Sequence, residues 1–410
     1  MRCLIVILLL IIAKIGFTQK IRVNPAKVFG GNVADFFESV EYIPLENSKE
    51  STLGFPRRLI ITYSSVVISD FDTYNIFFFN LSGNFLRKHS LPRNKGITTL
   101  IDYDSSGEMQ IVVQISPIER IGLFERRIYS ATGILLKVEK IENHEINIIS
   151  RFPIDAEFYL LNKLNFSSLK DFPFKKKKPL IEVYNKDGTL YKAFLNVDMD
   201  TNPFLFAYSG GITTSISEDG TIFCVVPFDY SLYKLTKDSV FQIGQFIFPS
   251  NYLLPNVDFN FQDYRLLDSV RKTNANNPNL IQSVCNINFY KNKMIFTLQK
   301  RLTILPSGDG KNISPMNFIY DTVSHKSVSF ERITPDNKSY FLPIMDGFSS
   351  SSGMNLKNGY LYSSISSLQM FSTFSLSKSK NPQYPPVLQQ YFKTQNRKSN
   401  PVIVRMKLKE

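Results

Sequence analysis

A short polar turn recurs along the chain, each time between two apolar runs. The copies fall at Gly83, Gly133, Gly188 and Ser239, so successive turns are 50, 55 and 51 residues apart. A repeat of this period is typical of arrays in which one supersecondary unit is copied along the chain. The sequence therefore predicts one small unit repeated several times.

The unit is clearest in residues 57–91. Four short β-forming runs at 59–63, 66–69, 75–80 and 85–91 are separated by stretches rich in Ser, Asp, Asn and Gly. Tight turns of this composition join antiparallel strands. Four such strands make one blade of a β-propeller, so we expect an all-β propeller of four-stranded antiparallel blades.

The spacing breaks after the fourth unit. Residues 249–280 are interpreted as an insertion between blades four and five, with helical spacing of apolar residues from 257 to 272. A fifth unit resumes at 281–333. The sixth contains only the runs 347–355 and 359–365 before an irregular segment, 366–399, so it is two strands short.

Two strands without a local partner supply that deficit. Residues 40–45, near the start, and 402–408, at the end, are β-forming runs with no neighbouring run to pair with. We expect them to close the sixth blade of a six-bladed ring, with 40–45 as the outer strand, because ring closure removes open sheet edges. A sandwich or barrel would also have regularly spaced strands, but it predicts neither the turn period nor the incomplete last unit.

The first 18 residues have the pattern of a signal peptide. Arg2 precedes the apolar run 4–13, and Gly16-Phe17-Thr18 provides a cleavage site before Gln19. Lys14 ends that run short of the roughly 20 residues that a membrane-spanning helix needs. Cys3 precedes the run, so it cannot be a lipoprotein cysteine. We expect an exported, monomeric domain of residues 19–410, periplasmic or extracellular, with no transmembrane segment after cleavage and no lipid anchor.

Three segments of the chain resemble a known family. The stretches FFESVEYIPLENSKESTLG (36–54), VVISDFDTYNIFFFNLSGNFLRK (66–88) and NPVIVRMKL (400–408) are similar to an exported six-bladed β-propeller family of bacteria, formerly a domain of unknown function. The resemblance covers essentially the whole mature chain and implies a fold like the NHL and TolB-type propellers. It implies no general activity or catalytic set. Many members carry a lipoprotein cysteine, which this chain lacks.

No motif for metal binding or catalysis stands out. The Asp-x-Asp pairs at 70/72, 102/104 and 198/200 are interpreted as turn residues, and the three histidines, His89, His144 and His325, fall in different units. There is no G-x-S-x-G elbow and no phosphate-binding glycine loop. We therefore predict no catalytic residues, no metal site and no cofactor.

Charge and cysteine content leave some alternatives open. The formal net charge of +13 favours anionic partners, but basic residues are not interleaved with exposed aromatics as nucleic-acid binding would require. The run Lys175–Lys178 is either a solvated loop or an anion site. Cys224 and Cys285 lie in apolar runs and are either buried free thiols or one disulfide.

The remaining candidates are positional. The innermost strand of each blade and the loop entering it surround the central channel, where ligands commonly bind. These positions are predicted to bind a polar or anionic ligand such as a glycan or peptide, or else only to complete the channel rim: Arg57, Arg58, Lys95, Asp102, Arg151, Tyr208, Asn286 and Asp346.

Two functions are therefore carried forward. The first is an exported, non-catalytic binding or scaffold module that uses one face of the ring to hold a polar ligand, glycan, peptide or cell-envelope protein. The alternative is a calcium-dependent hydrolase or lyase with its site in the central channel, which would need acidic and amide side chains converging there from separate blades.

Overall fold

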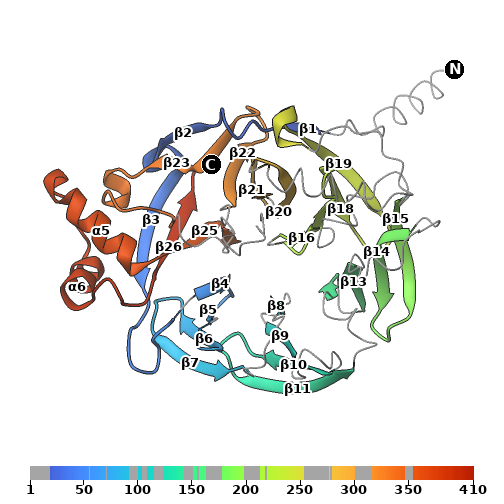
Figure 1. Cartoon of the computed structure of the whole chain (residues 1–410), viewed down its shortest axis with the longest axis horizontal. Helices are drawn as coiled ribbons and strands as arrows, with labels where there is room; N and C mark the ends of the chain where they lie inside the picture. Colours follow the sequence, from blue (N-terminus) through green and yellow to red (C-terminus); the bar gives the residue numbers. More distant parts are fainter. Residues whose placement is uncertain are drawn as a thin grey trace, which may run out of the picture.

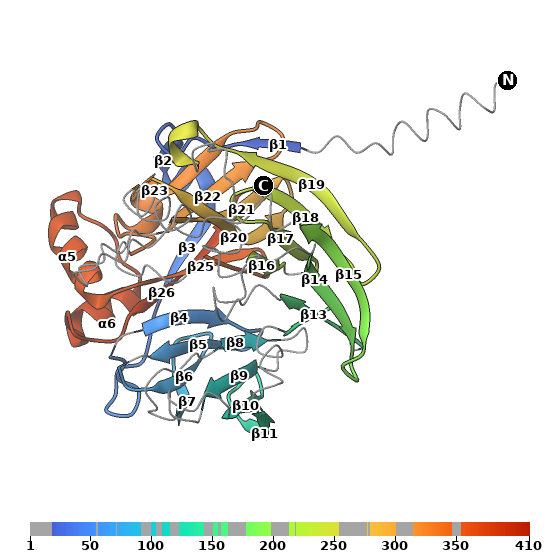
Figure 2. The ribbon, with the colours of Figure 1, turned by 45° about the vertical axis from the view of Figure 1, so that its right-hand side comes forward.

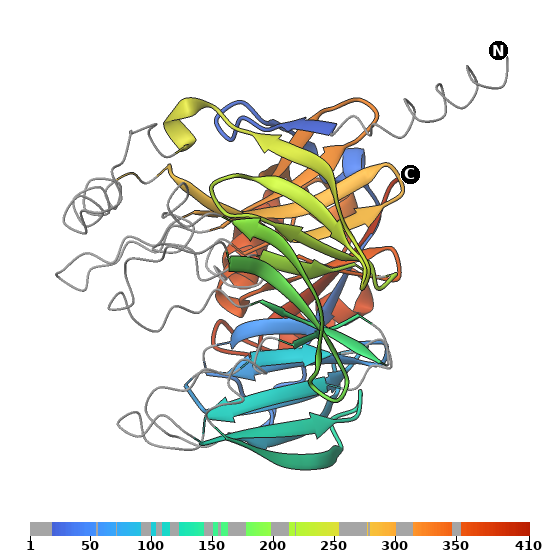
Figure 3. The same cartoon turned by 90° about the vertical axis from the view of Figure 1, so that its right-hand side faces the viewer.

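The structure is a computed structural model, drawn as a ribbon from three directions in Figures 1, 2 and 3. It describes residues 19–54, 56–70, 72–91, 100–103, 109–114, 123–142, 151–154, 157–162, 178–197, 213–217, 219–253, 277, 279–300, 315–346 and 354–410.

Strands in the described part of the chain form six sheets placed around a ring (Figure 1). The first three sheets each contain four strands consecutive in the chain. They are β4 (Pro56–Ile61), β5 (Ser65–Asp70), β6 (Asn75–Asn80) and β7 (Phe85–Ser90); β8 (Leu100–Tyr103), β9 (Met109–Gln114), β10 (Leu123–Tyr129) and β11 (Leu135–Glu142); and β12 (Arg151–Pro153), β13 (Phe158–Asn162), β14 (Lys178–Asn185) and β15 (Leu190–Val197).

The other three sheets also take strands from the N-terminal part of the chain. They are β16 (Thr213–Ile216), β17 (Ile222–Val225), β18 (Ser231–Leu235) and β19 (Val240–Ile247) with β1 (Gln19–Arg22); β20 (Ile281–Tyr290), β21 (Lys293–Lys300), β22 (Met316–Asp321) and β23 (Ser327–Thr334) with β2 (Phe29–Asn32); and β24 (Asn355–Lys357), β25 (Tyr360–Ile365) and β26 (Val402–Leu408) with β3 (Phe37–Pro44).

The expected all-β propeller fold is confirmed. Within each sheet, neighbouring strands are antiparallel apart from β1 and β2. The recurring turns lie where the sequence placed them, between the third and fourth strands of their sheets, and Gly83, Gly133 and Gly188 all have positive φ. At Gly83 a Cβ would approach the Pro44 carbonyl oxygen to 2.3 Å, so the turn packs directly against the strand β3.

The predicted pairing of the chain ends is also confirmed. β3 is the outermost strand of its sheet and pairs antiparallel with β26, from Val402 opposite Pro44 to Leu408 opposite Phe37. Phe37, Val404 and Met406 are fully buried in one apolar cluster. We call this pairing the seam, because it joins a strand from the N-terminal part of the chain to the last strand.

The first strands of the described chain were not predicted. β1 pairs parallel with β19, and β2 pairs parallel with β23, so residues 19–32 cross the outer edges of two sheets before β3 joins a third (Figures 1 and 2). We call residues 19–32 the strap. Gly30 permits this close crossing, because a Cβ there would meet the Arg332 carbonyl oxygen at 2.4 Å.

The segment 366–399 was expected to be irregular, and this is wrong. It contains α5 (Ser367–Ser377), the short 3₁₀ helix η5 (Lys378–Lys380) and α6 (Pro386–Thr394). These helices bury few side chains, including Met370, Leu388 and Tyr391. Seven serines and three prolines interrupt the segment, and they obscured the helical spacing.

The remaining helices are short. α2 (Val33–Phe36) links the strap to β3, and the 3₁₀ helices η3 (Ser250–Tyr252) and η4 (Asn337–Ser339) follow β19 and β23. The predicted helical stretch 257–272 lies outside the described residues. Among the helices that are described, none is long and apolar enough to cross a membrane.

Cys224 and Cys285 are both free, so the disulfide alternative is excluded. Burial raises the pKa of both thiols. The neutral thiols are therefore packing residues of the β17 and β20 strands rather than reactive groups.

Candidate functional site

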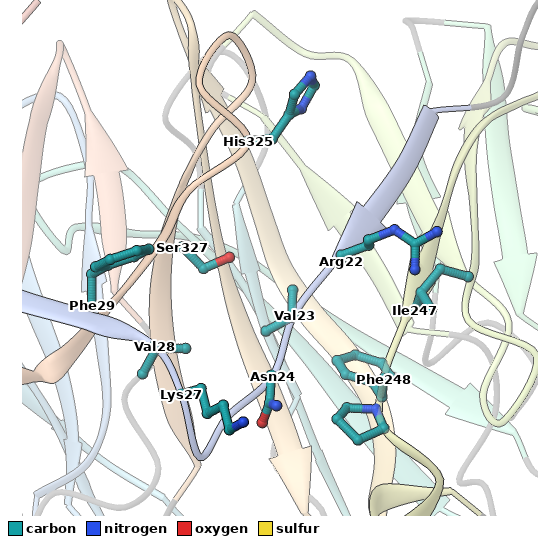
Figure 4. Close-up of a pocket in the computed structure, with 11 residues that line it drawn as sticks. Arg22, Val23, Asn24, Lys27, Val28, Phe29, Ile247, Phe248, His325 and Ser327 are labelled. Atoms are coloured by element: carbon teal, nitrogen blue, oxygen red, sulfur yellow. The ribbon is translucent and has the colours of Figure 1, made fainter.

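A cavity lies beneath the strap, at the outer edge of the ring. Its volume is about 380 Å³. It is lined by the strap, by the end of β19 and by the hairpin between β22 and β23, as Figure 4 shows. The lining residues are Arg22, Val23, Asn24, Lys27, Val28, Phe29, Ile247, Phe248, Pro249, His325 and Ser327.

The cavity exists because the strap leaves one sheet before it joins the next. The Val23 amide still donates to the Ile247 carbonyl at 3.0 Å, which is the last bond to β19. A turn follows, in which Asn24 Oδ1 accepts from the Ala26 amide at 3.1 Å. Pairing resumes at Phe29, opposite Val328. The intervening residues span the gap between the two sheets.

Arg332 fixes the far side of this turn. Its guanidinium donates to the carbonyl oxygens of Val28 at 2.9 Å and Ala26 at 3.0 Å. Two hydrogen bonds from one planar group hold both the position and the orientation of the strap. The roof of the cavity is therefore built from backbone that a single side chain anchors.

Ser327 provides an unsatisfied polar group in the cavity wall. It is 8% exposed, and its buried Oγ has no hydrogen-bond partner among the described residues. In Figure 4 this oxygen points away from its own strand towards Val23 and Arg22. A buried hydroxyl without a partner costs about 1–3 kcal/mol, so a water molecule or a ligand oxygen that accepted from Ser327 Oγ would offset that cost.

Among the described residues, the charged side chains that line the cavity are Arg22 and Lys27, and none is acidic. Both are exposed and form no ion pair with any residue that the structure describes. Nearby Asp321 accepts hydrogen bonds from the amides of Val323 and Ser324, which hold the pKa of its carboxyl below the usual range. The cavity therefore favours anions.

His325 has a fixed partner of its own. Its Nδ1 lies 2.8 Å from the Tyr320 hydroxyl, and its backbone has a φ of 58° in the hairpin turn. The ring is exposed at the cavity edge rather than hydrogen-bonded to Ser327. The described geometry thus does not pair a base with the serine hydroxyl, as nucleophilic catalysis would require.

The floor of the cavity is apolar. Val23, Val28 and Phe248 are each at most 6% exposed and belong to one core cluster. Phe29 stands at the edge with 54% of its surface exposed, and Lys326 Nζ lies 5.6 Å from its ring centroid. A ligand with both an anionic group and an apolar part matches this arrangement.

Among the predicted channel residues whose side chains are described, Arg58, Asn286 and Asp346 do not line this cavity. Four sheets contribute through the edge strand opposite their outer strand: Arg57 and Arg58 lie on β4, Asp102 on β8, Arg151 on β12 and Asn286 on β20. The side chains of Arg57, Asp102 and Arg151 are not described, and Lys95 and Tyr208 lie outside the described residues.

Two of these residues have described hydrogen bonds. Asn286 is exposed, has a φ of 53°, and donates through Nδ2 to Thr297 Oγ1 at 3.3 Å. Asp346 is 4% exposed and accepts from the Ser366 amide at 2.8 Å, at the start of α5. Asp346 therefore has a structural role in anchoring that helix. Ligand binding at the channel stays a prediction.

The metal candidates can be followed in part. Asp70 Oδ1 accepts from the amides of Asp72 and Thr73 at 3.0 and 3.1 Å, which is the predicted turn chemistry. His89 Nε2 lies 2.6 Å from the Gly133 carbonyl oxygen. No group of three or more His, Cys, Asp or Glu side chains suited to a metal is found among the described residues.

Some of the other candidates fall outside this part of the chain. Asp104, Asp198, Asp200, His144 and residues 175–177 of the lysine run are not described; Lys178 begins β14. The calcium-dependent alternative therefore remains a prediction that these residues do not test.

The described sheets define the class of this protein as a β-propeller. No protein-family model and no curated protein matches the sequence. A solved structure of a candidate exported protein from Bacteroides fragilis matches 96% of this chain and 100% of its own, with a TM-score of 0.60 and 13% identity. At this identity the likeness concerns the fold alone.

Two further solved structures are more distant. A member of a family of unknown function from Bacteroides vulgatus has a TM-score of 0.42 and 11% identity, over 90% of this chain and 98% of its own. Virginiamycin B lyase from Staphylococcus aureus has a TM-score of 0.35 and 11% identity, over 79% of this chain and 81% of its own.

Proposed function

We propose that this chain is an exported, six-bladed, non-catalytic propeller that binds a small amphipathic anion in the cavity beneath the strap. In this proposal each of the six sheets is one blade of an NHL- and TolB-like ring. The strap and the β22–β23 hairpin form the binding face.

The unpartnered Ser327 hydroxyl is the observation that carries the proposal. It is buried, it lies in a cavity wall, and the cations that line the same cavity, Arg22 and Lys27, have no described counter-ion. A ligand oxygen accepting from Ser327 Oγ would satisfy the hydroxyl and balance the positive charge.

A carboxylate attached to an apolar group is the ligand class that fits best. Its oxygens would accept from Ser327 and pair with Arg22 or Lys27, while its apolar part would cover Val23, Val28 and Phe248. The cavity volume of about 380 Å³ is within the range of small-molecule sites. A short acyl carboxylate or the carboxyl end of an apolar peptide has these features.

Isothermal titration calorimetry with a matched ligand pair tests this function. Octanoate should bind and octanamide, of similar shape but neutral, should bind at least tenfold more weakly, because a hydrogen bond between charged groups is worth about 1.5–3 kcal/mol. Equal affinity for the two would contradict the proposal.

A matched pair of variants locates the site. Arg22→Gln should weaken octanoate binding about tenfold or more. Lys20→Gln removes the same charge from the same strand, but Lys20 does not line the cavity. This control should leave the affinity within about twofold, since an exposed charge at a distance is screened by salt. An equal loss in both variants would show attraction to net charge rather than a site.

A further inference from the structure

The α5–α6 hairpin, defined here as residues 366–399, is a second cationic region that is independent of the cavity. It is inserted between β25 and β26 and projects from the outside of its sheet (Figures 1 and 2). Its 34 residues contain no Asp or Glu and five basic residues: Lys378, Lys380, Lys393, Arg397 and Lys398. All five are exposed.

The hairpin is a packed unit rather than a loose loop. Phe374 and Phe392 stack with ring centroids 4.1 Å apart, and Phe371 meets Phe392 edge to face at 5.3 Å. The Tyr391 hydroxyl donates to Ser367 Oγ at 2.7 Å, and Ser367 Oγ in turn donates to the Asn400 carbonyl at 2.6 Å. These contacts join α6 to α5 and both to the start of β26.

The same packing leaves an apolar side of α5 uncovered. Leu368 is 49% exposed and Leu376 is 79% exposed, and with Ser372 between them they follow one helix face at intervals of four residues. The serine hydroxyls do not make this face polar, because Ser372 Oγ donates to the Leu368 carbonyl at 2.8 Å and Ser375 Oγ to the Phe371 carbonyl at 3.0 Å. Val387 of α6 is a further exposed apolar residue, at 50%.

The cations of the hairpin have no described acidic partner. Lys378 Nζ lies 5.4 Å from the centroid of the Phe374 ring and Lys380 Nζ lies 4.6 Å from that of Phe341, so both ammonium groups rest on aromatic rings rather than on carboxylates. Lys393, Arg397 and Lys398 form no ion pair with any residue in the described ranges. The hairpin thus combines exposed leucine side chains with positive charge that no described acidic residue neutralises.

We propose that the α5–α6 hairpin docks this protein onto a membrane surface containing anionic lipids. A region with basic and no acidic residues is attracted to a layer of anionic lipid headgroups. Each Lys or Arg near such a surface raises the affinity about fivefold. Exposed leucines on one helix face then enter the boundary between headgroups and acyl chains. A protein partner is less well matched, because the aromatic side chains that usually anchor such interfaces pack against one another inside the hairpin.

Vesicle co-sedimentation tests the proposal with the full mature chain. Binding to vesicles of phosphatidylcholine and phosphatidylglycerol should be strong at low salt and should weaken as salt is added, whereas vesicles of phosphatidylcholine alone should bind weakly. The triple variant Lys378→Gln, Lys380→Gln and Lys393→Gln should lose about a hundredfold in affinity for the mixed vesicles, from about fivefold for each charge.

A matched triple variant controls for net charge. Lys88 of β7, Lys140 of β11 and Lys186 in the turn between β14 and β15 are exposed, and they belong to the first three sheets rather than to the sheet that carries the hairpin. Changing all three to Gln lowers the net charge equally and should change vesicle binding by less than about threefold, since the hairpin charges remain. Equal losses in the two triple variants, or equal binding to both vesicle types, would overturn the proposal.

Leu376→Ser separates docking from self-association. The substitution removes apolar surface that the membrane would bury, so binding to mixed vesicles should weaken about tenfold. The protein should stay folded, because Leu376 is 79% exposed in the free protein. Light scattering on the wild-type protein shows whether the hairpin instead joins two copies of the chain. A dimer that Leu376→Ser converts to a monomer would assign the hairpin to a second copy of the chain and contradict the membrane proposal.

Discussion

The seam and the strap both tie the N-terminal part of the chain to distant sheets, but they do so differently. The seam joins seven antiparallel residue pairs, and most of its β26 side chains are buried. The strap makes two short parallel pairings, of four and three residue pairs, and only Ile21 of its paired residues is buried. The seam is built for stability, whereas the strap leaves room for a cavity.

The difference shows where a propeller of this kind can place a binding site. A closed seam with a continuous core has no space for a ligand without loss of packing. A segment that crosses from the edge of one sheet to the edge of the next must span the gap between them. Here the cavity lies in that gap, and the unpartnered Ser327 hydroxyl is part of its wall.

Truncating the seam should have the largest effect. Met406 is fully buried in the cluster that β26 shares with β3. Met406→Ala should lower the free energy of unfolding by about 2–5 kcal/mol, because it leaves a cavity in a packed core. Chemical denaturation measures the change. The control, Lys407→Ala, changes the next residue, which lies on the exposed side of the strand, and should leave the denaturation midpoint nearly unchanged. Equal shifts of the midpoint in the two variants would show that core packing at the seam does not set the stability of the fold.

Releasing the strap should have a smaller, local effect. Arg332→Gln removes the guanidinium that bonds the Val28 and Ala26 carbonyls, with an expected loss of about 1.5–3 kcal/mol in strap stability. Hydrogen exchange should speed up at the Ile21 and Val23 amides but not in β26. The Arg332→Lys variant should keep part of the protection of these amides against exchange. Faster exchange throughout the ring would mean that strap and seam unfold together.

Acid should loosen the strap side before the seam. Hydrogen bonds from the Ser324 and Val323 amides lower the pKa of Asp321 in the folded state. A carboxyl with a lowered folded pKa stabilises the fold above its unfolded pKa of about 3.9, and this contribution is lost as the pH falls through the folded value. The His325 hairpin should therefore become more mobile in NMR spectra below about pH 4. In the Asp321→Asn variant, this gain in mobility below about pH 4 should disappear. If the variant showed the same gain, Asp321 would not be the group that titrates.

The sequence predicted the seam because its signals are strong and long. Val402 to Leu408 alternate in sequence and have no local partner, and the turn period gave the number of missing strands. The strap was missed because β1 and β2 have four residues each, with Gly30 and Gly31 in the second. Such short strands have no usable periodicity, and parallel pairing to β19 and β23 depends on the finished ring.

The candidate site could not be predicted for the same reason. Ser327 and His325 were visible only as part of a hairpin, and Arg22 and Lys27 only as isolated charges near a predicted cleavage site. Nothing in their spacing links residues 22–29 to residues 325–327, because the link is made by β2 pairing with β23. A search restricted to the channel therefore could not include them.

Thermal unfolding of Ser327→Ala, with and without octanoate, tests the central claim most directly. Without ligand, the variant should unfold at a higher temperature than the wild type, because it no longer buries an unsatisfied hydroxyl. With octanoate, the wild type should gain more stability than the variant, because its hydroxyl donates to the carboxylate. A variant less stable than the wild type without ligand, and equally stabilised by octanoate, would contradict the account.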